Sequence, residues 1–341
     1  MLFRRSTPPP HHDPRRPPLR RDLKGWTGSR PLNYVYCAGA GEKPINLRPA
    51  TQLPRLLPAE PLSRDGRRHR PAGRDAAPIS RCVRSDRPLD SLLIERNGAI
   101  LTLRLNQPEK HNALDLQAMQ ALTAEIAKVA ADPGDLRVLI LTGAGEKTFC
   151  AGADLSGVDE NYPWWENPLD TLSSMLEKLP IATVCSLNGS VYGGGTDLAL
   201  ACDFRIGQTG TRMFIPPARF GIHYQINGLR RAQERIGLGP SKRLYLAGET
   251  FDCDQMLQCG FLDHAIAPAD HAAFVDAYVA ELAGMAPLSI AGMKYVLNAS
   301  ARGELDYARA MDGVRRCFTS EDFREAGRAK AEKRKPVFTG R

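Results

Sequence analysis

The sequence lacks the residue patterns of several common kinds of site. Its eight cysteines include no CxxC pair and are not accompanied by a cluster of histidines. A zinc centre and a disulfide framework are therefore both disfavoured, and this cysteine usage suits a reducing cytoplasm. Within residues 1–88 no apolar run is long enough for a signal peptide or a transmembrane span. We expect a cytoplasmic protein with no metal site and no membrane association.

Complete nucleotide-binding motifs are also missing. The stretch GAGEKT at 143–148 resembles the end of a phosphate-binding loop, but Glu146 occupies the glycine position before Lys147. No G-x-G-x-x-G follows a strand in a convincing unit. The sequence therefore argues against nucleotide hydrolysis and against dinucleotide binding.

The net charge of +8 is unevenly distributed along the chain. Residues 1–88 hold 19 Lys and Arg against 7 Asp and Glu, together with 15 of the 26 prolines, whereas the remainder holds 27 against 31. Dense proline and arginine leave little with which to build a core, so we interpret residues 1–88 as a disordered basic extension. A targeting peptide and a nucleic-acid-binding arm are the alternatives, although no aromatic interleaving supports the second.

From residue 89 the pattern is typical of an α/β fold. Residues 91–105 predict two short strands around the turn RNG, and 136–143 and 181–189 predict buried strands, each followed by helical periodicity. Asp115 is expected to cap a helix with one apolar face. The expected core positions of this helix are Leu116, Met119, Leu122, Ile126 and Val129.

After residue 268 the periodicity is helical throughout. We therefore divide the chain into three parts. These are the extension at 1–88, a core at 89–285 and a C-terminal helical region at 286–341.

Two glycine-rich loops follow two of the buried strands. The first is FCAGADL at 149–155, and the second is NGSVYGGGTDLA at 188–199. Glycines allow a ligand to approach the backbone, and the helix after the second loop directs free N–H groups at that position. Two amides from two loops can hold one oxyanion and so stabilise an enolate without a nucleophile. The alternative is that these glycines only permit tight turns.

Several motifs, in order and spacing, resemble the crotonase superfamily of enoyl-CoA hydratases and isomerases. They are LNQPEKHNALD, LILTGAGEKTFCAGADL, SLNGSVYGGGTDLALACDFRIG and GLGPSKRLYLAGETFDCDQMLQCGFLDHAI. The resemblance covers about 89–341. It implies a spiral core of repeated ββα turns, a helical C-terminal region, and trimers or hexamers. It further implies acyl-CoA thioester substrates, with coenzyme A as part of the substrate, no separate cofactor and no nucleic-acid partner.

The same resemblance assigns roles to particular residues. The oxyanion amides correspond to Ala153 and Gly194. Asp154 is expected to fix the first loop, and Lys333 is a candidate for binding a phosphate of coenzyme A. The positions that correspond to substrate and coenzyme A contacts are Ala151, Gly152, Asp154, Leu155, Pro216 and Lys333.

The two glutamates that hydratases of this family use are both replaced. Asp197 stands at the first position, where its shorter side chain places the carboxylate about 1.5 Å further back. Pro217 stands at the second position and cannot transfer a proton. Hydration by two glutamates is therefore not expected.

A second branch of the superfamily matches the sequence around this gap. The stretch IPPARFGIHYQINGLRR at 215–231 and the C-terminal segment at 315–340 resemble decarboxylases of the methylmalonyl-CoA type, which carry a tyrosine where Tyr224 stands. Decarboxylation needs little acid–base help. Tyr224 would orient the departing carboxylate while the two amides hold the enolate. The first functional hypothesis is therefore decarboxylation of a methylmalonyl-CoA-type substrate.

Other interpretations remain open. An enoyl-CoA hydratase or isomerase could use Asp197 alone, and a non-catalytic protein could bind RNA or a membrane surface through its basic extension. Tyr224 could merely pack beneath the loop, and Asp197 could be an acid favoured by the helix dipole. Lys333 could belong to a solvated helix end.

Overall fold

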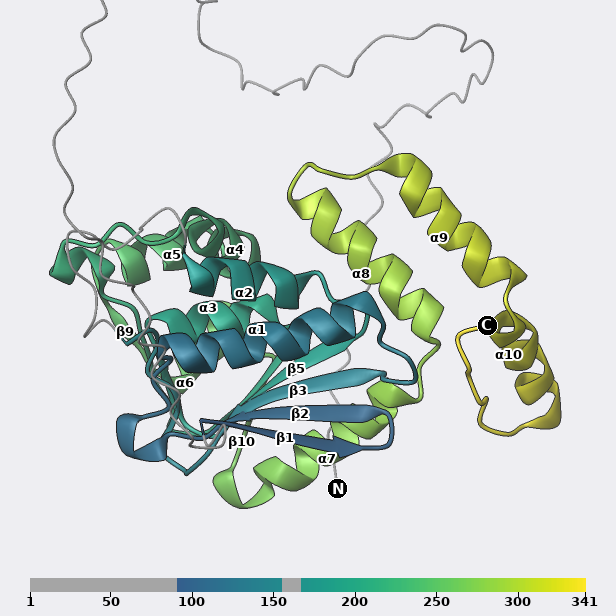
Figure 1. Cartoon of the computed structure of the whole chain (residues 1–341), viewed down its shortest axis with the longest axis horizontal. Helices are drawn as coiled ribbons and strands as arrows, with labels where there is room; N and C mark the ends of the chain where they lie inside the picture. The colour runs from purple at the N-terminus through teal and green to yellow at the C-terminus, as the bar shows by residue number, and fades with distance from the viewer. Residues whose placement is uncertain (1–90, 155–166) are drawn as a thin grey trace, which may run out of the picture. The chain divides into compact units, whose positions relative to one another are not determined.

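The computed structural model describes residues 91–154 and 167–341 (Figure 1). The predicted extension at 1–88 lies outside the described residues, and so does Leu155. The described residues all belong to the compact unit Ser80–Arg341.

The strands form two sheets. The six-stranded sheet has the order β1-β2-β3-β5-β7-β10 and the four-stranded sheet has the order β4-β6-β8-β9. The pairs β1–β2 and β8–β9 are antiparallel, and the other pairs of the described sheets are parallel. The strands are β1 Leu92–Asn97, β2 Ile100–Leu105, β3 Val138–Gly143, β4 Thr148–Cys150, β5 Ala182–Leu187, β6 Ser190–Tyr192, β7 Phe204–Gln208, β8 Met213–Phe214, β9 Thr250–Phe251 and β10 His264–Ile266.

From α1 to α4 the helices alternate with pairs of strands, and in the pairs β3–β4, β5–β6 and β7–β8 the first strand enters the six-stranded sheet and the second enters the four-stranded sheet. The chain passes through β3, β4 and α2, and then through β5, β6 and α3. The predicted crotonase-like core of repeated ββα turns is thereby confirmed. The helices are α1 Leu116–Ala131, α2 Pro168–Glu177, α3 Gly194–Ala201, α4 Ile226–Ile236, α5 Leu238–Tyr245, α6 Cys253–Gln258, α7 Pro268–Ala283, α8 Pro287–Ala301, α9 Tyr307–Thr319 and α10 Glu321–Glu332, with 3₁₀ turns η1 Pro108–Lys110 and η2 Pro217–Phe220.

Strand β3 is buried on both faces, as its continuous apolar sequence predicts. Leu139 and Leu141 belong to the core that α1 and α2 cover. Ile140, on the opposite face, belongs to a second cluster that includes Val275 of α7. Figure 1 shows α1, α2 and α3 on one side of the large sheet and α7 on the other.

Helix α1 begins as predicted at its cap. The carboxylate of Asp115 accepts a hydrogen bond from the amide of Ala118 at 2.8 Å, a contact worth about 1 kcal/mol. Four of the five expected core positions are buried: Met119, Leu122, Ile126 and Val129. The expectation for Leu116 is wrong, because this side chain is 57% exposed. It lies about 120° around the helix from Leu122 and so misses the buried face.

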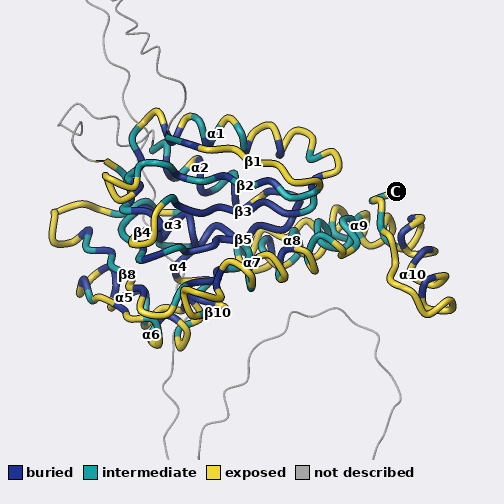
Figure 2. The backbone as a smooth tube through the Cα atoms, turned by 90° about the horizontal axis from the view of Figure 1, so that it is seen from below, coloured by how far each residue is buried: buried dark blue, intermediate teal, exposed yellow. Residues whose placement is uncertain are grey.

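The C-terminal region is helical from residue 268, as predicted, and α8 and α9 lie side by side (Figure 1). Lys294 of α8 is anchored to the core by an ion pair of 2.7 Å with Asp203. By contrast, α9 has no buried residue, and Figure 2 shows mainly exposed and intermediate positions along α9 and α10. The division of the core at residue 285 stays a prediction.

None of the described helices is by itself long and apolar enough to span a membrane.

Candidate active site

The two glycine-rich loops meet at one edge of the four-stranded sheet. Strand β4 leads into Gly152 and Ala153, and β6 leads into Gly193 and Gly194. Because β4 and β6 are parallel neighbours, the loops after them emerge at the same edge. The sequence prediction that these loops share one site is consistent with this topology.

The two loops approach so closely that glycine is needed on both sides. Gly152 has a φ of +91°, and a Cβ there would lie 2.5 Å from the amide nitrogen of Gly194. A Cβ on Gly194 would clash with Cδ2 of Leu169 and would lie 3.3 Å from the amide nitrogen of Ala153. The two amide nitrogens therefore lie close together where the loops meet, and the side chain of Leu169 packs beside Gly194.

Neither amide is used by the described part of the chain. The amide of Leu114 donates to the carbonyl of Gly152 at 2.8 Å, and the amide of Asp154 donates to the carbonyl of Leu114 at 2.9 Å. Successive N–H groups of extended chain point in opposite directions, so the N–H of Ala153 faces away from Leu114. Gly194 is the first residue of α3, and its N–H has no acceptor within the helix. Within residues 91–154 and 167–341, neither N–H donates a hydrogen bond.

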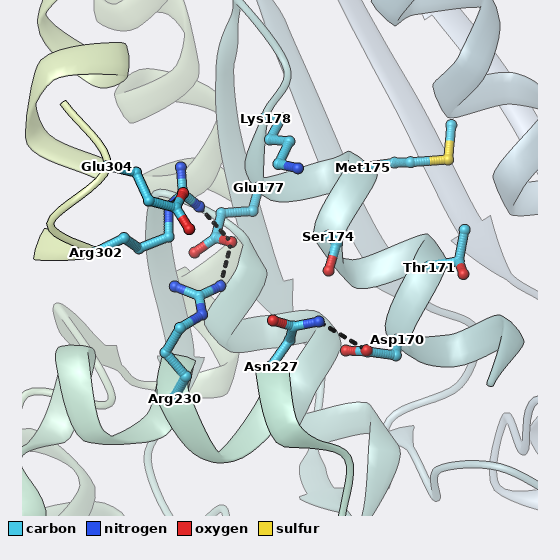
Figure 3. A pocket seen from close by; sticks show the side chains of 10 residues that line it. All are labelled: Asp170, Thr171, Ser174, Met175, Glu177, Lys178, Asn227, Arg230, Arg302 and Glu304. Carbon is cyan, nitrogen blue, oxygen red and sulfur yellow. Dashed lines mark hydrogen bonds and ion pairs between the residues drawn. The ribbon is translucent and has the colours of Figure 1, made fainter. Parts of the chain in front are cut away.

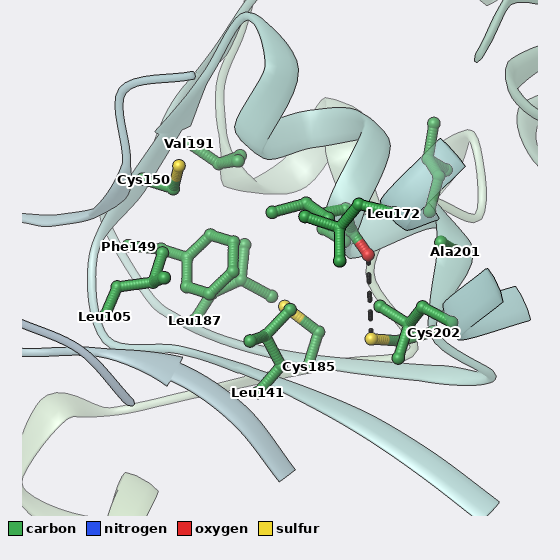
Figure 4. Close-up of a cluster of buried hydrophobic side chains, with 14 of the residues drawn as sticks. Leu105, Leu141, Phe149, Cys150, Leu172, Cys185, Leu187, Val191, Ala201 and Cys202 are labelled. Carbon is green, nitrogen blue, oxygen red and sulfur yellow. Dashed lines mark hydrogen bonds between the residues drawn. The ribbon is translucent and has the colours of Figure 1, made fainter. Parts of the chain in front are cut away.

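Cys150, just before the first loop, is a structural residue. Its side chain is fully buried near Phe149 and Val191 (Figure 4), and its sulfur accepts a hydrogen bond from the amide of Gly152 at 3.3 Å. Burial raises the pKa of the Cys150 thiol to about 12. The thiol is therefore protonated at neutral pH and is not a nucleophile.

Asp197 lies one turn into α3 and is fully buried. One carboxylate oxygen is ion-paired with Arg231, and the other accepts a hydrogen bond from the side-chain amide of Gln225 at 3.0 Å. Burial raises the pKa of Asp197 above its ordinary value, although the charge of Arg231 opposes this rise. The residue at the family's acid–base position is thus held by two protein partners.

Tyr224 contacts the second loop directly. Its hydroxyl donates to the carbonyl of Gly193 at 3.2 Å, and its ring packs edge-on against Tyr245 with centroids 4.9 Å apart. Burial raises the pKa of Tyr224 well above its ordinary value, so the hydroxyl remains a donor at neutral pH. The side chain packs beside the loop, as one of the two sequence interpretations expects.

Not all of the other predicted site residues lie at the two glycine-rich loops. Ala151 joins the first loop to the segment before α1, because its amide donates to the carbonyl of His111 at 3.0 Å. Pro216 precedes the turn η2, in which Pro217 is buried. Lys333 ends α10, which lies far from α3 in Figures 1 and 2. In the described residues, no group of three His, Cys, Asp or Glu side chains could hold a metal ion.

Sequence reasoning missed Arg231, although a signal for it exists. The buried positions of α4 are Gly228, Arg231, Ala232 and Ile236, which form one helical face. An arginine on such a face must find a buried acid. The acids it finds are Asp197 and, at 3.7 Å, Glu177.

Two backbone N–H groups that lie close together beside a helix N-terminus are an arrangement that can hold an oxyanion. Comparison of the sequence with known proteins identifies the family. The chain belongs to the enoyl-CoA hydratase/isomerase family, which it matches over residues 95–341.

Individual relatives support the assignment. The chain is 32% identical over 251 residues to Probable enoyl-CoA hydratase echA6 of Mycobacterium leprae, covering 72% of this chain and 98% of that protein. It is 34% identical over 255 residues to Enoyl-CoA isomerase/hydratase fer4 of Mycosarcoma maydis, covering 70% and 92%. The crystal structure of an enoyl-CoA hydratase from Bacillus anthracis is similar with a TM-score of 0.68 at 25% identity, covering 74% and 100%.

Proposed function

We propose that this protein binds an acyl-CoA thioester with its carbonyl oxygen between the amides of Ala153 and Gly194, and that these amides stabilise an enolate. The observation that carries the proposal is the close approach of the two loops that carry these amides, neither of which donates a hydrogen bond to another described residue. Removal of one such donor typically costs about 100- to 1000-fold in rate, so two donors supply a large part of a catalytic effect. Burial of the neighbouring Cys150 thiol argues against a covalent route through that residue.

Hydration or isomerisation of an enoyl-CoA is our first candidate reaction. It is favoured by the names of the relatives, which include an enoyl-CoA hydratase and an enoyl-CoA isomerase/hydratase. Both reactions move a proton, and a proton-transfer group must come within hydrogen-bond reach. Asp197 is held by Arg231 and Gln225, and Pro217 has no titratable group. Proton transfer by Asp197 would require its ion pair to open.

Decarboxylation of a methylmalonyl-CoA-type thioester, the first hypothesis from the sequence, is the second candidate. The observation in its favour is that neither Asp197 nor Pro217 offers a free acid, and loss of CO₂ requires only that the enolate left behind be stabilised. The carboxylate contact proposed for Tyr224 would require its hydroxyl to leave the carbonyl of Gly193.

Parallel assays of the full chain on crotonyl-CoA and methylmalonyl-CoA test the proposal. Loss of the conjugated enoyl absorbance with the first substrate supports hydration, and release of CO₂ from the second supports decarboxylation. Thioester binding without turnover of either would favour the non-catalytic alternative, and absence of binding would overturn the proposal.

The remaining expectations are part of the same proposal. Coenzyme A would enter as part of the substrate, with no separate cofactor. The substrate contacts proposed from the resemblance are Ala151, Gly152, Asp154, Leu155, Pro216 and Lys333. A cytoplasmic location and an assembly of three or six chains also remain predictions.

A further inference from the structure

Arg231 is the largest fully buried side chain of the described residues, and it lies between two acids. One Nη atom is ion-paired with Asp197 of α3, and the Nε atom lies 3.7 Å from the carboxylate of Glu177 of α2. A guanidinium that is fully withdrawn from water needs such partners, because an unpaired buried charge is strongly destabilising. Arg231 therefore connects three helices: α2, α3 and α4.

The two acids depend on Arg231 to different degrees. Glu177 is also paired with Arg230 at 3.0 Å and with Arg302 at 3.1 Å (Figure 3). Burial raises the pKa of Glu177, but the three guanidinium groups outweigh this effect and bring the pKa below its ordinary value. Among the described residues, the cation that is ion-paired with Asp197 is Arg231. Loss of Arg231 would thus leave Asp197 without a compensating charge, whereas Glu177 would keep two.

Besides the backbone bonds of Gly193, whose amide donates to the carbonyl of Phe214 and whose carbonyl accepts from Tyr224, helix α3 has, in the described part of the chain, one charged contact near its N-terminal end. Its N-cap is Gly193, which offers no side chain, and Asp197 is the one charged residue among Gly194–Ala201. The carboxylate of Asp197 is bound from α4 by Arg231 and from the residue before α4 by Gln225. Gly194 lies three residues earlier, which is a rise of about 4.5 Å along the same helix. A shift of Asp197 would therefore move the amide of Gly194.

We propose that Arg231 is a positioning residue for the reaction: its ion pair with Asp197 fixes α3 and so keeps the amide of Gly194 directed at the substrate oxygen. This inference rests on the proposed function. In this role Asp197 acts by holding α3 in place. The proton that moves during hydration or isomerisation is then not carried by Asp197.

Acetoacetyl-CoA is a probe that reports on the oxyanion site without turnover. Its C2 proton passes to the buffer when the bound thioester becomes an enolate, and the enolate is seen by its ultraviolet absorbance. Two donors aimed at the oxygen raise the fraction of enolate, and a misplacement of about 1 Å can cost about 100-fold in stabilisation.

Arg231→Met removes the charge at similar length. We expect it to lower the bound enolate fraction at least about tenfold and kcat about 100-fold, with a much smaller change in the Kd for acetoacetyl-CoA. Arg230→Met is the matched control on the same helix, because the ion pairs of Arg230 within the described residues are with Glu177 and Glu234 and not with Asp197. Its enolate fraction should remain within about threefold of wild type.

Asp197→Asn separates positioning from proton transfer and carries the test if Arg231→Met does not fold. Asparagine keeps the size of the side chain but removes its charge. Positioning predicts that the enolate fraction and kcat fall together, whereas proton transfer by Asp197 predicts loss of kcat with an unchanged enolate fraction. A wild-type enolate fraction in either folded variant overturns the role of Arg231. Failure of the wild-type protein to bind any CoA thioester overturns the proposed function itself, and this role with it.

Discussion

The hydroxyl of Tyr224 donates a hydrogen bond to the carbonyl oxygen of Gly193, the residue that precedes the proposed oxyanion amide of Gly194. Tyr224→Phe removes this bond and leaves the ring in place. Since one neutral hydrogen bond is worth about 1 kcal/mol, we expect kcat to fall about fivefold for any thioester that the protein turns over. The Kd for the thioester should change little. Parallel assays on crotonyl-CoA and methylmalonyl-CoA would measure this.

Tyr245→Phe is the matched control, because the Tyr245 hydroxyl is buried without a hydrogen-bond partner in the described residues. It should leave kcat unchanged. If Tyr224→Phe instead abolished decarboxylation alone, the hydroxyl would have to leave Gly193 and bind the substrate carboxylate, as the sequence-based hypothesis expects.

Gly152→Ala tests whether the space between the two loops is used. The new Cβ would lie 2.5 Å from the amide nitrogen of Gly194, so it would force the loops apart or cover the donor. We expect kcat to fall by about 100-fold or more, together with the enolate fraction of bound acetoacetyl-CoA.

Backbone strain from a positive φ must be separated from this effect. Gly210→Ala provides the comparison, because Gly210 has a φ of +83° and nothing lies within 4 Å of its Cβ position. Gly210→Ala should lose about 1 kcal/mol of stability from its positive φ alone and retain its kcat, whereas Gly152→Ala should lose more stability because the steric clash adds to the same strain. Equal activity of the two folded variants would refute the backbone-amide mechanism.

Local patterns were sufficient to predict much of the fold. The cap at Asp115, the doubly buried strand β3 and the helices after residue 268 follow from periodicity and short-range hydrogen bonding, and the structure has all three. The prediction was wrong for Leu116. This apolar residue was assigned to the buried face of α1, but the helical geometry places it off that face.

The site could be predicted only in part, because its polar contacts are formed between distant segments. The loops with Ala153 and Gly194 carry a local glycine signature, so they were found from the sequence. Asp197 and Arg231 are separated by 34 residues, and nothing in either segment specifies the pairing of α3 with α4. Only the packing of these helices reveals that the acid at the family's proton-transfer position is engaged by a buried cation.

Glu325 predicts an acid-sensitive contact in the C-terminal region. Hydrogen bonds from Arg334 and from the amide of Val337 lower the pKa of Glu325 from 4.5 to about 2. Because the pKa is depressed in the folded state, the contribution to stability is present above the unfolded value of 4.5 and is lost as the pH falls toward 2. We expect Glu325→Gln to lower the Tm at neutral pH, and the difference from wild type to shrink over that interval.

The control for this experiment is Glu321→Gln, which removes an exposed ion pair with Arg324 at the start of the same helix. Its effect on Tm should be smaller at neutral pH, since exposed pairs contribute little. A difference between wild type and Glu325→Gln that stays constant from neutral pH down to the acid limit of folding would contradict the assignment.

An apolar stripe on α8 and α9 bears on the assembly of the protein. On α9 the exposed apolar side chains recur at intervals of four, three and four residues, which places them on one helical face. Two more, on α8, are one turn apart. The stripe consists of Met293 and Leu297 on α8 and Tyr307, Met311, Val314 and Phe318 on α9. Apolar side chains gathered in this way mark a protein–protein contact more often than a solvated face.

We expect a second copy of the chain to cover this stripe, in an assembly of three or six chains. Glutamate at Met311 and Phe318 together would place two charges in the contact, where burying them without partners is unfavourable. Light scattering after size-exclusion chromatography should then report a monomer for Met311→Glu/Phe318→Glu and an oligomer for wild type. Leu116→Glu is the control, because Leu116 is 57% exposed but lies on α1, outside the stripe. A monomeric wild type, or an oligomer that survives both charges, would show that the stripe serves another purpose.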